Sequence, residues 1–223
     1  MTQMINKNST SGPLGRHCLR EPIPEIDQAA LMLLEAVSAH QLGDGMRAEY
    51  LIRLANMEEI REWSNSLWGK SSPYVQYRGT PSAEPYLSRS ERQIVQMPTL
   101  AQRRQLHQRD GYHCRFCGVP VMRKEVRQWF VAAYPGLAIW GRTHDTQHAA
   151  FQTIWAQYDH VVPHARGGDN DLSNIIVTCA PCNYGRMSYT LEEVNVLGPR
   201  AREPIRSHWD GLERVFHSGV AAR

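Results

Sequence analysis

The chain has no run of about 18 consecutive apolar residues, which is the length that a membrane-spanning helix requires, so a membrane partner is not expected. It also has no apolar core in its first residues, MTQMINKNSTSGPLGRHCLREP, so export is not expected. These absences predict a cytoplasmic, reducing setting. Cysteine is scarce, with five residues in 223. In such a setting, cysteines paired as C-x-x-C are more typical of metal or redox sites than of structural disulfides.

Composition excludes a wholly disordered chain, because 42 % of the residues are hydrophobic and six are tryptophan. The length allows one core with additions or two small domains. The net charge of +3 is unevenly distributed. Residues 25–62 carry eight acidic and three basic side chains, whereas residues 99–190 carry ten basic and six acidic ones. The second stretch therefore suits a module that faces phosphate, and the first does not.

Segments rich in glycine and proline, which are typical of turns and loops, divide the chain into five predicted regions. These are a flexible arm at 1–24, a helical N-terminal region at 25–70, a linker at 71–98, a compact module at 99–190 with a helical insertion at 118–158, and a C-terminal tail at 191–223 that packs on the core.

The helical region is predicted to contain three short helices. QAALMLLEAVSAHQ follows Asp27 and stops at a Gly-Asp-Gly turn, a second helix runs from about Met46 to Ala55, and Asn56 is the expected N-cap of a third. We expect these helices to pack together or to bind a protein partner rather than to recognise DNA, because they are acidic. In the tail, a helix is expected to start at Thr190, with Trp209, Leu212 and Phe216 packing on the core.

Four of the five cysteines form two pairs. Cys114 and Cys117 stand two residues apart in C-R-F-C, as do Cys179 and Cys182 in C-A-P-C, and 61 residues separate the pairs. Two such knuckles complete a tetrahedral four-thiolate zinc site, which is closed and therefore structural. A redox role would require a thioredoxin-like βαβ pattern that the sequence does not show. Cys18 lies in the polar arm and is most simply a spare thiol.

The stretch Y-D-H-V-V-P-H-A-R-G-G places His160 and His164 four residues apart. A metalloprotease helix of the H-E-x-x-H type is excluded, because valine follows His160 and Pro163 would break the helix. The valine pair favours a strand, and the Gly-Gly-Asp-Asn that follows favours a turn. The run from Asn174 to Thr178 predicts a second strand, which leads into the second knuckle and a helix after Cys182.

Three segments occur in this order: R-D-G-x-x-C-x-x-C-G, D-H-V-V-P-x-x-x-G-G and N-I-I-V-x-C-x-x-C-N-x-x-R. Together, from about Arg109 to Arg186, they resemble the HNH endonucleases, and more narrowly their zinc-stapled, McrA-like branch. The resemblance implies an α+β chain: a ββα-metal nuclease core stapled by the four-cysteine zinc site, preceded here by the helical region. It also implies endonucleolytic hydrolysis of DNA.

The resemblance assigns a role to five residues. His160 takes the place of the general base, and Asp159 and Asn183 take those of the ligands of one catalytic Mg²⁺ or Mn²⁺. Asn174 corresponds to the residue that braces the loop and orients the base, and Arg186 to a residue that binds the scissile phosphate. Oxygen ligands suit a hard cation and thiolates retain zinc, so ligand type keeps the two metals apart.

Other residues near these motifs are left with alternatives. Arg166 beside the double glycine is a candidate phosphate contact. His164 is a candidate third ligand, phosphate contact or solvent-exposed loop residue. The insertion is read as two helices, around 122–134 and 146–157. In the first, Arg123, Lys124 and Arg127 either contact the DNA backbone or form a solvated face. His144 and His148 lack a third ligand at suitable spacing, which argues against a second metal pair.

Rival functions remain open at this point. One is a non-catalytic zinc-stapled module that binds nucleic acid or protein, although such a module does not need Asp159, His160, Asn174 and Asn183 together. Another is a restriction or anti-phage effector that a protein partner activates through the N-terminal helices. A single site of this kind cleaves one phosphodiester at a time, so cutting both strands would require a homodimer or two visits.

Overall fold

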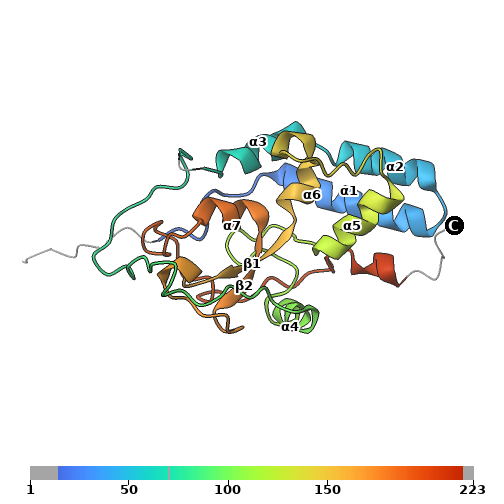
Figure 1. Cartoon of the computed structure of the whole chain (residues 1–223). Coiled ribbons are helices and arrows are strands. Elements are labelled where there is room, and N and C mark those ends of the chain that lie inside the picture. Colours follow the sequence, from blue (N-terminus) through green and yellow to red (C-terminus); the bar gives the residue numbers. More distant parts are fainter. Residues whose placement is uncertain (1–14, 70, 218–223) are drawn as a thin grey trace, which may run out of the picture.

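A computed structural model describes residues 15–69 and 71–217 (Figure 1). Within them the α-helices are α1 (Pro24–Gln41), α2 (Gly45–Leu54), α3 (Glu58–Ser66), α4 (Leu100–Asp110), α5 (Lys124–Ala133), α6 (Ala149–Thr153) and α7 (Ala180–Arg186). Short 3-10 helices lie at η1 (His144–Thr146), η2 (His164–Arg166) and η3 (Glu213–Phe216). The two strands are β1 (Ala156–His160) and β2 (Ile175–Cys179).

The two strands and α7 form a ββα unit. Strand β1 pairs antiparallel with β2, in a register that sets Asp159 opposite Ile176 and His160 opposite Ile175. Helix α7 follows β2 directly and contacts both strands. Every residue of β2 is buried, as its apolar composition requires. The predicted α+β class, with a small sheet at the nuclease-like motif, is confirmed.

The expected helix at 146–157 is shorter than predicted. Helix α6 ends at Thr153, and β1 begins at Ala156, whose N–H donates to Met122 O at 2.9 Å. Val161 and Val162 follow the strand instead of forming it. The chain leaves the regular ladder there because Val162 N–H donates to the side chain of Asn174, at 2.9 Å, instead of to a backbone carbonyl.

Helices α1 to α3 pack on the insertion instead of standing apart. Buried residues of the N-terminal helices and of residues 119–154 belong to one hydrophobic core. The hydroxyls of Ser64 on α3 and Thr153 on α6 are hydrogen-bonded at 2.5 Å inside it. Asn56 does not cap α3 with its side chain. Its Oδ1 accepts from Ala149 N–H at 2.7 Å, so it ties the start of α3 to the start of α6.

Residues 71–98 form neither helix nor strand, yet they lie along the ββα unit (Figure 1). Arg78 N–H donates to Glu193 O at 2.7 Å, and Leu87 N–H donates to Ala165 O at 3.0 Å. The segment predicted as a linker therefore borders the turn between β1 and β2.

The ends of the described chain meet the core. Residue Arg16 forms a parallel bridge with Val196, and Cys18 is only 3 % exposed, so it is not a thiol of a solvated arm. The predicted helix at Thr190 does not form. Thr190 and Glu193 bond to each other's backbone as in a capping box, but Asn195 adopts a positive φ of 52°, which ends any helix there.

Part of the tail packs as its apolar residues predict. Trp209 Nε1–H donates to Val121 O at 2.8 Å, and Leu212 is fully buried. Phe216, by contrast, is 47 % exposed.

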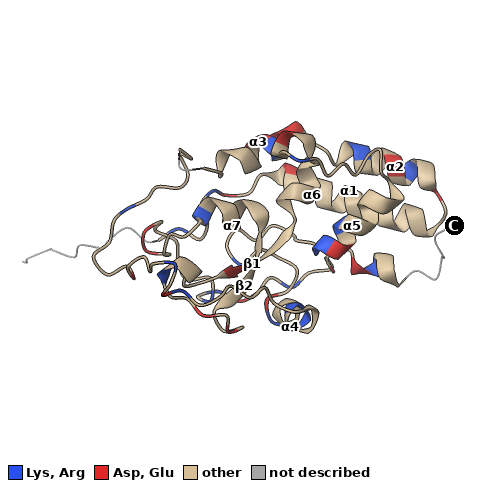
Figure 2. Cartoon of the chain, in the orientation of Figure 1, with Lys and Arg blue, Asp and Glu red and all other residues tan. Residues whose placement is uncertain are grey.

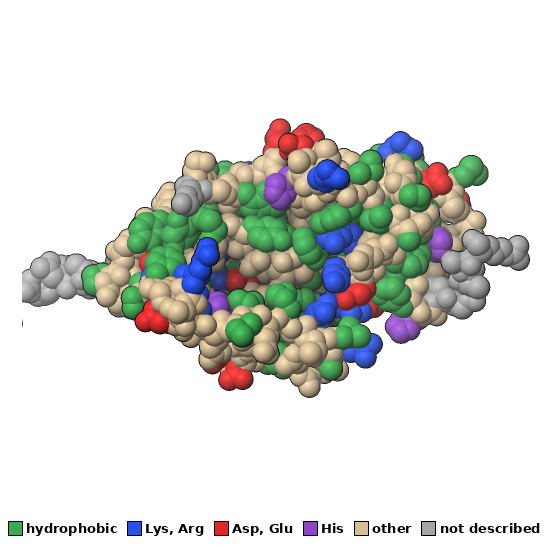
Figure 3. Space-filling view, in the orientation of Figure 1, with side chains coloured by type: hydrophobic (Ala, Val, Ile, Leu, Met, Phe, Trp, Pro, Cys, Tyr) green, Lys and Arg blue, Asp and Glu red, His purple; other side chains and the backbone are tan. Residues whose placement is uncertain are grey.

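The charge asymmetry of the sequence is visible on the surface. Acidic residues gather on α3, α4 carries basic ones, and the loops around β1 and β2 carry both (Figure 2). On the same face, Lys and Arg side chains form a line across the middle of the molecule (Figure 3). None of the helices in the described ranges is long and apolar enough to cross a membrane.

Candidate active site and metal centre

The four paired cysteines converge at one point. The sulfur atoms of Cys114, Cys117, Cys179 and Cys182 all lie within 4.8 Å of one another, and those of Cys117 and Cys179 are 3.6 Å apart. Tetrahedral zinc–thiolate bonds of about 2.3 Å place sulfur atoms about 3.8 Å apart, so the cluster has the dimensions of such a site. It could therefore bind a metal such as zinc.

The first knuckle is fastened to the sheet beside the second. Gly118 N–H donates to Cys114 O at 2.9 Å, and Gly118 adopts a φ of 84°, which favours glycine. Arg115 N–H donates to Val177 O on β2, also at 2.9 Å. Because β2 runs straight into Cys179, a metal in the cluster would fix both strand and helix of the ββα unit.

Asp159 lies on the buried side of β1, where it meets Arg186 of α7. The guanidinium donates through Nη2 to Oδ1 at 2.7 Å and through Nε to Oδ2 at 3.0 Å. Burial raises the pKa of Asp159, and the charge of Arg186 opposes that rise. The pair is a two-point ion pair inside the protein, and it anchors α7 to β1.

Arg186 is 1 % exposed, and all three of its guanidinium nitrogens donate within the protein. Besides Asp159, they donate to the carbonyls of Val161, Tyr189 and His160, at 3.4, 2.8 and 2.5 Å. The expected phosphate contact by Arg186 is therefore not open in this arrangement. The residue faces inward because α7 packs on β1.

Asn183 lies one turn before Arg186 on α7, and residues three apart share a helix face. Its side chain is half-buried, on the side of α7 that meets Asp159. Each carboxylate oxygen keeps a second lone pair beyond its bond to Arg186. The oxygens of Asp159 and of the Asn183 amide can thus still act as ligands, and oxygen is the ligand atom that a hard divalent cation prefers.

His160 ends β1 and is half-buried. Its Nε2 lies 3.3 Å from Oδ1 of Asn170, a residue of the Gly-Gly-Asp-Asn turn. Two backbone contacts fix the orientation of that amide, because Oδ1 accepts from Gln96 N–H at 3.3 Å and Nδ2 donates to Ile94 O at 3.0 Å. An oxygen facing Nε2 requires the proton to be on Nε2. The lone pair of a neutral His160 then lies on Nδ1, where it can accept a proton.

Asn170 is the contact that sequence reasoning missed. The resemblance implies that Asn174 braces the loop and orients the base; its side chain contacts the backbone of the loop. Its Oδ1 accepts from Val162 N–H at 2.9 Å, and its Nδ2 donates to the carbonyls of Val162 and Asp169 at 3.2 and 3.0 Å. Asn170 lies in the turn between the two strands, and the chain must pass close to His160 there. The spacing of the two residues in the sequence does not by itself predict their contact.

The turn requires glycine at both positions of the Gly167-Gly168 pair, for two different reasons. Gly167 adopts a φ of 86°, in the left-handed region. A Cβ on Gly168 would lie 1.8 Å from Val162 O and 2.9 Å from Asn174 Nδ2, so no side chain fits. The pair therefore allows the turn to close onto the residues that follow His160.

Arg166 and His164 both face the neighbouring segments. Arg166 is 7 % exposed, donates to Glu193 at 2.6 Å and to the carbonyls of Glu84 and Ser188, and stacks on Tyr86. Its expected phosphate contact is thus not open either. His164 contacts the carbonyl of Gln93 through Nε2, and its ring centroid is 6.1 Å from that of His160.

Two of the three basic residues in the first predicted helix of the insertion are internal. Arg123 pairs with Glu213 at 2.5 Å, and Arg127 lies between the rings of Trp140 and Trp155, at 3.4 and 4.3 Å from their centroids. Lys124 is exposed. Of these three, only Lys124 matches a solvated or DNA-facing position.

The two histidines of the insertion are held by protein groups. His148 caps α6 through Nδ1 and contacts Ile52 O through Nε2 at 2.9 Å. His144 packs on Trp68 and contacts Gln152.

The sequence was compared with known proteins in three ways. The family model for HNH endonuclease matches residues 148–193. No curated protein and no solved structure matches. The matched span contains α6, both strands, α7 and the second cysteine pair. Residues 148–193 are thus similar to the HNH endonucleases, as their motifs predict.

Proposed function

We propose that this protein is a metal-dependent endonuclease that hydrolyses DNA phosphodiester bonds, with His160 as general base. The observation that carries the proposal is the contact between Nε2 of His160 and Oδ1 of Asn170, from which we infer the tautomer of the imidazole. With the proton of a neutral imidazole on Nε2, Nδ1 is left to take a proton from the attacking water. A non-catalytic binding module has no need for a histidine held in this way.

Asp159 and Asn183 are the residues that would hold the catalytic Mg²⁺ or Mn²⁺. A divalent ion in such a site supplies neutralisation of charge on the leaving 3′ oxygen. Arg186 shares the carboxylate of Asp159, so it positions the ligand and reduces the negative charge there. We therefore expect weak metal affinity and a requirement for millimolar cation.

The four-cysteine cluster is proposed to hold zinc, as in the McrA-like branch of the family. The thiolates form a closed site, and its contribution is to the fold and not to the reaction. Loss of this zinc and loss of the catalytic cation should therefore have different consequences, unfolding in the first case and inactivity in the second.

The first experiment is nicking of supercoiled plasmid in Mg²⁺ or Mn²⁺ by wild type and His160→Ala at matched zinc content. The expected result is open-circle product from wild type alone. His208→Ala, which removes an exposed histidine, is the matched control and should nick normally. Silence from wild type with its zinc retained would leave two readings, the binding module or an effector without its partner, and equal nicking by His160→Ala would contradict the assigned base.

A protein partner is the second part of the proposal, in a restriction or anti-phage setting. Leu42, Met46 and Tyr50, at the end of α1 and along α2, are 86, 85 and 61 % exposed and offer apolar surface to a partner. Copurification of a second protein, lost when Met46 and Tyr50 are changed to Ser, is the measurement. A monomer that nicks alone would remove the need for either partner or homodimer.

A further inference from the structure

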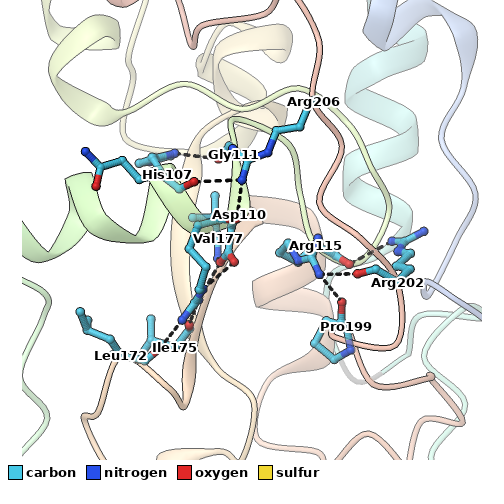
Figure 4. Close-up of polar contacts among 12 residues, drawn as sticks. His107, Asp110, Gly111, Arg115, Leu172, Ile175, Val177, Pro199, Arg202 and Arg206 are labelled. Atoms are coloured by element: carbon cyan, nitrogen blue, oxygen red, sulfur yellow. Dashed lines mark hydrogen bonds and ion pairs between the residues drawn. The ribbon is translucent and has the colours of Figure 1, made fainter.

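A basic hollow lies beside the first cysteine knuckle, on elements that the proposed reaction does not use. Figure 4 shows three of its arginines, Arg115, Arg202 and Arg206, with their polar contacts. The volume of the hollow is about 530 Å³, and it opens between the end of α4, the knuckle and the chain after residue 198. Its lining is dominated by arginine: Arg109, Arg115, Arg200, Arg202 and Arg206, with Asp110, Glu203 and Pro204. We name it the arginine hollow.

Backbone carbonyls hold four of these arginines in place. Arg109 donates to the carbonyls of Leu172 and Ile175, at 2.6 and 2.5 Å. Arg115 Nη2 donates to the carbonyls of Pro199 and Arg202, at 2.7 Å each. In return, Arg202 donates to Arg115 O at 2.9 Å and to Phe116 O. Arg206 donates to the carbonyls of residues 108 and 109 at 2.9 and 2.8 Å. Carbonyl oxygens orient a guanidinium, but they carry no charge to neutralise it.

The positive charge of the hollow is only partly compensated. Arg109 forms an ion pair with Asp110, at 2.8 Å. Across the described ranges, the other four arginines make no ion pair, and Glu203 is the second of the two carboxylates in the lining. Burial lowers the pKa of Arg115; the charges of Arg202 and Arg109 add to this lowering, and those of Asp110 and Glu203 oppose it. An anion in the hollow would relieve this repulsion.

Arg200 connects the arginine hollow to the candidate active site. This residue is exposed and lines a second hollow of about 340 Å³. The walls of the second hollow include Val161, Gly168 and Asn174, which belong to the turn that follows His160. A chain of phosphates that occupied the arginine hollow could therefore continue past Arg200 to that turn.

We propose that the arginine hollow binds the phosphodiester backbone of the nucleic acid, away from the bond that is cleaved. The inference rests on the proposed function and adds to it the surface that holds the substrate. A guanidinium group held in a fixed position can donate two hydrogen bonds to the oxygens of one phosphate. Because the hollow is open, a nucleic-acid strand could cross it and continue on both sides. Contacts to phosphate carry no sequence information, so this surface contributes affinity and register alone.

The test measures binding of a fluorescent 30-base-pair duplex by anisotropy, over a series of salt concentrations. All proteins carry His160→Ala and retain their zinc, so no cleavage intervenes. Arg200→Ala with Arg206→Ala is the test variant, because both side chains are exposed. Arg47→Ala with Arg53→Ala on α2 removes the same charge from exposed positions elsewhere. Arg200→Lys with Arg206→Lys keeps the charge and removes the two-point geometry.

The expected result is a loss of affinity of about 10-fold or more for the alanine pair in the hollow, with a salt slope lower by about two, one for each phosphate contact. The control pair should lose less than about 2-fold, and the lysine pair should fall between. Equal losses for the hollow and control pairs would overturn the proposal, since they would reflect net charge.

A second arm distinguishes the nucleic-acid backbone from free phosphate. Thermal unfolding is followed with inorganic phosphate as the probe. Stabilisation by phosphate that the alanine pair abolishes, with duplex binding unchanged, would make the hollow a small-anion site and overturn the proposal. Because binding is measured in the His160→Ala background, an inactive wild type, whether a binding module or an effector without its partner, would leave this result standing.

Discussion

The carboxylate of Asp159 and the guanidinium of Arg186 form a buried two-point ion pair, and the same guanidinium donates to the backbone carbonyl of His160. One side chain of α7 thus fixes both a proposed metal ligand and the backbone of the proposed base. The contact explains why a basic residue stands three positions after Asn183. In this structure Arg186 braces helix against strand, and its guanidinium is occupied by protein groups.

Replacing Arg186 by alanine is expected to lower the free energy of unfolding by about 3–5 kcal/mol, because it leaves the carboxylate of Asp159 buried without its partner. The side chains concerned are only 2 and 8 % exposed. Urea denaturation is the measurement. Asp159→Ala with Arg186→Ala should cost less than the two single changes added together. Arg47→Ala, which breaks an exposed pair with Glu35, is the control and should cost less than about 1 kcal/mol.

Asn170→Ala is expected to lower kcat by about 10-fold to 100-fold with little change in KM, because the imidazole of His160 loses the group that fixes its tautomer. The ¹⁵N shifts of the ring should show the neutral proton on Nε2 in wild type and a mixture in the variant. Asn170→Asp keeps an oxygen toward Nε2 and should retain more activity. Asp171→Ala, an exposed change in the same turn, should alter neither readout; unaltered ¹⁵N shifts in Asn170→Ala would refute the assignment.

Removal of metal from the cysteine cluster is expected to unfold the ββα unit, because binding of zinc by such sites contributes on the order of 10 kcal/mol to folding. Cys182→Ser should lose the metal and much of the cooperative thermal transition. Metal content and circular dichroism, measured on the same samples, check this. Cys18→Ser removes a buried thiol that lies outside the cluster, so it should keep about one zinc per chain. Full stability in a metal-free protein would show that the staple is dispensable.

Gly168→Ala is expected to cost about 2 kcal/mol or more and to abolish nicking, because the new methyl would overlap Val162 O. Any relief must move the turn that Asn174 braces, and with it the residues that follow His160. Gly198→Ala is the matched control, since a Cβ there meets nothing within 4 Å. Thermal unfolding and the plasmid assay together distinguish a displaced turn from a simple loss of stability. Normal nicking by Gly168→Ala would show that the turn tolerates a side chain.

Some parts of the site could be predicted from the sequence because they depend only on residues that are close together in the chain. The cysteine pairs, the double glycine and the order of strand, turn, strand and helix follow from residue type and spacing. The strand boundary could not be placed, since Val162 leaves the ladder for the side chain of Asn174, twelve residues away. Thr190 likewise has the residues of a helix start, but Asn195 ends the helix before it forms.

The directions of long polar side chains could not be predicted either. Arg186 and Arg166 stand where a sequence pattern suits phosphate, yet each is turned inward by a carboxylate, Asp159 or Glu193, that reaches it only in the fold. The contact of Asn170 with His160 depends on residues 94 and 96, which read as linker. Packing of a segment without regular structure has no periodicity, and sequence patterns therefore do not reveal it.

The last prediction concerns His148, which is buried between α6 and Ile52. Burial lowers its pKa to about 4, although the contact with Ile52 O opposes this. A histidine whose pKa is lower in the folded state binds its proton mainly on unfolding. Its contribution to stability is therefore complete above a pH of about 6.5 and is lost as the pH falls toward 4.

Between about pH 7 and pH 5 this single group should lower the free energy of unfolding by about 2 kcal/mol. His148→Gln removes the titration, so its unfolding free energy should fall by that much less than wild type over the same interval. Urea denaturation at both pH values gives the difference. His208→Gln, at an exposed position, should follow wild type. Parallel pH curves for wild type and His148→Gln would mean that His148 does not remain neutral in the folded protein, and that α6 tolerates a charged imidazole at its start.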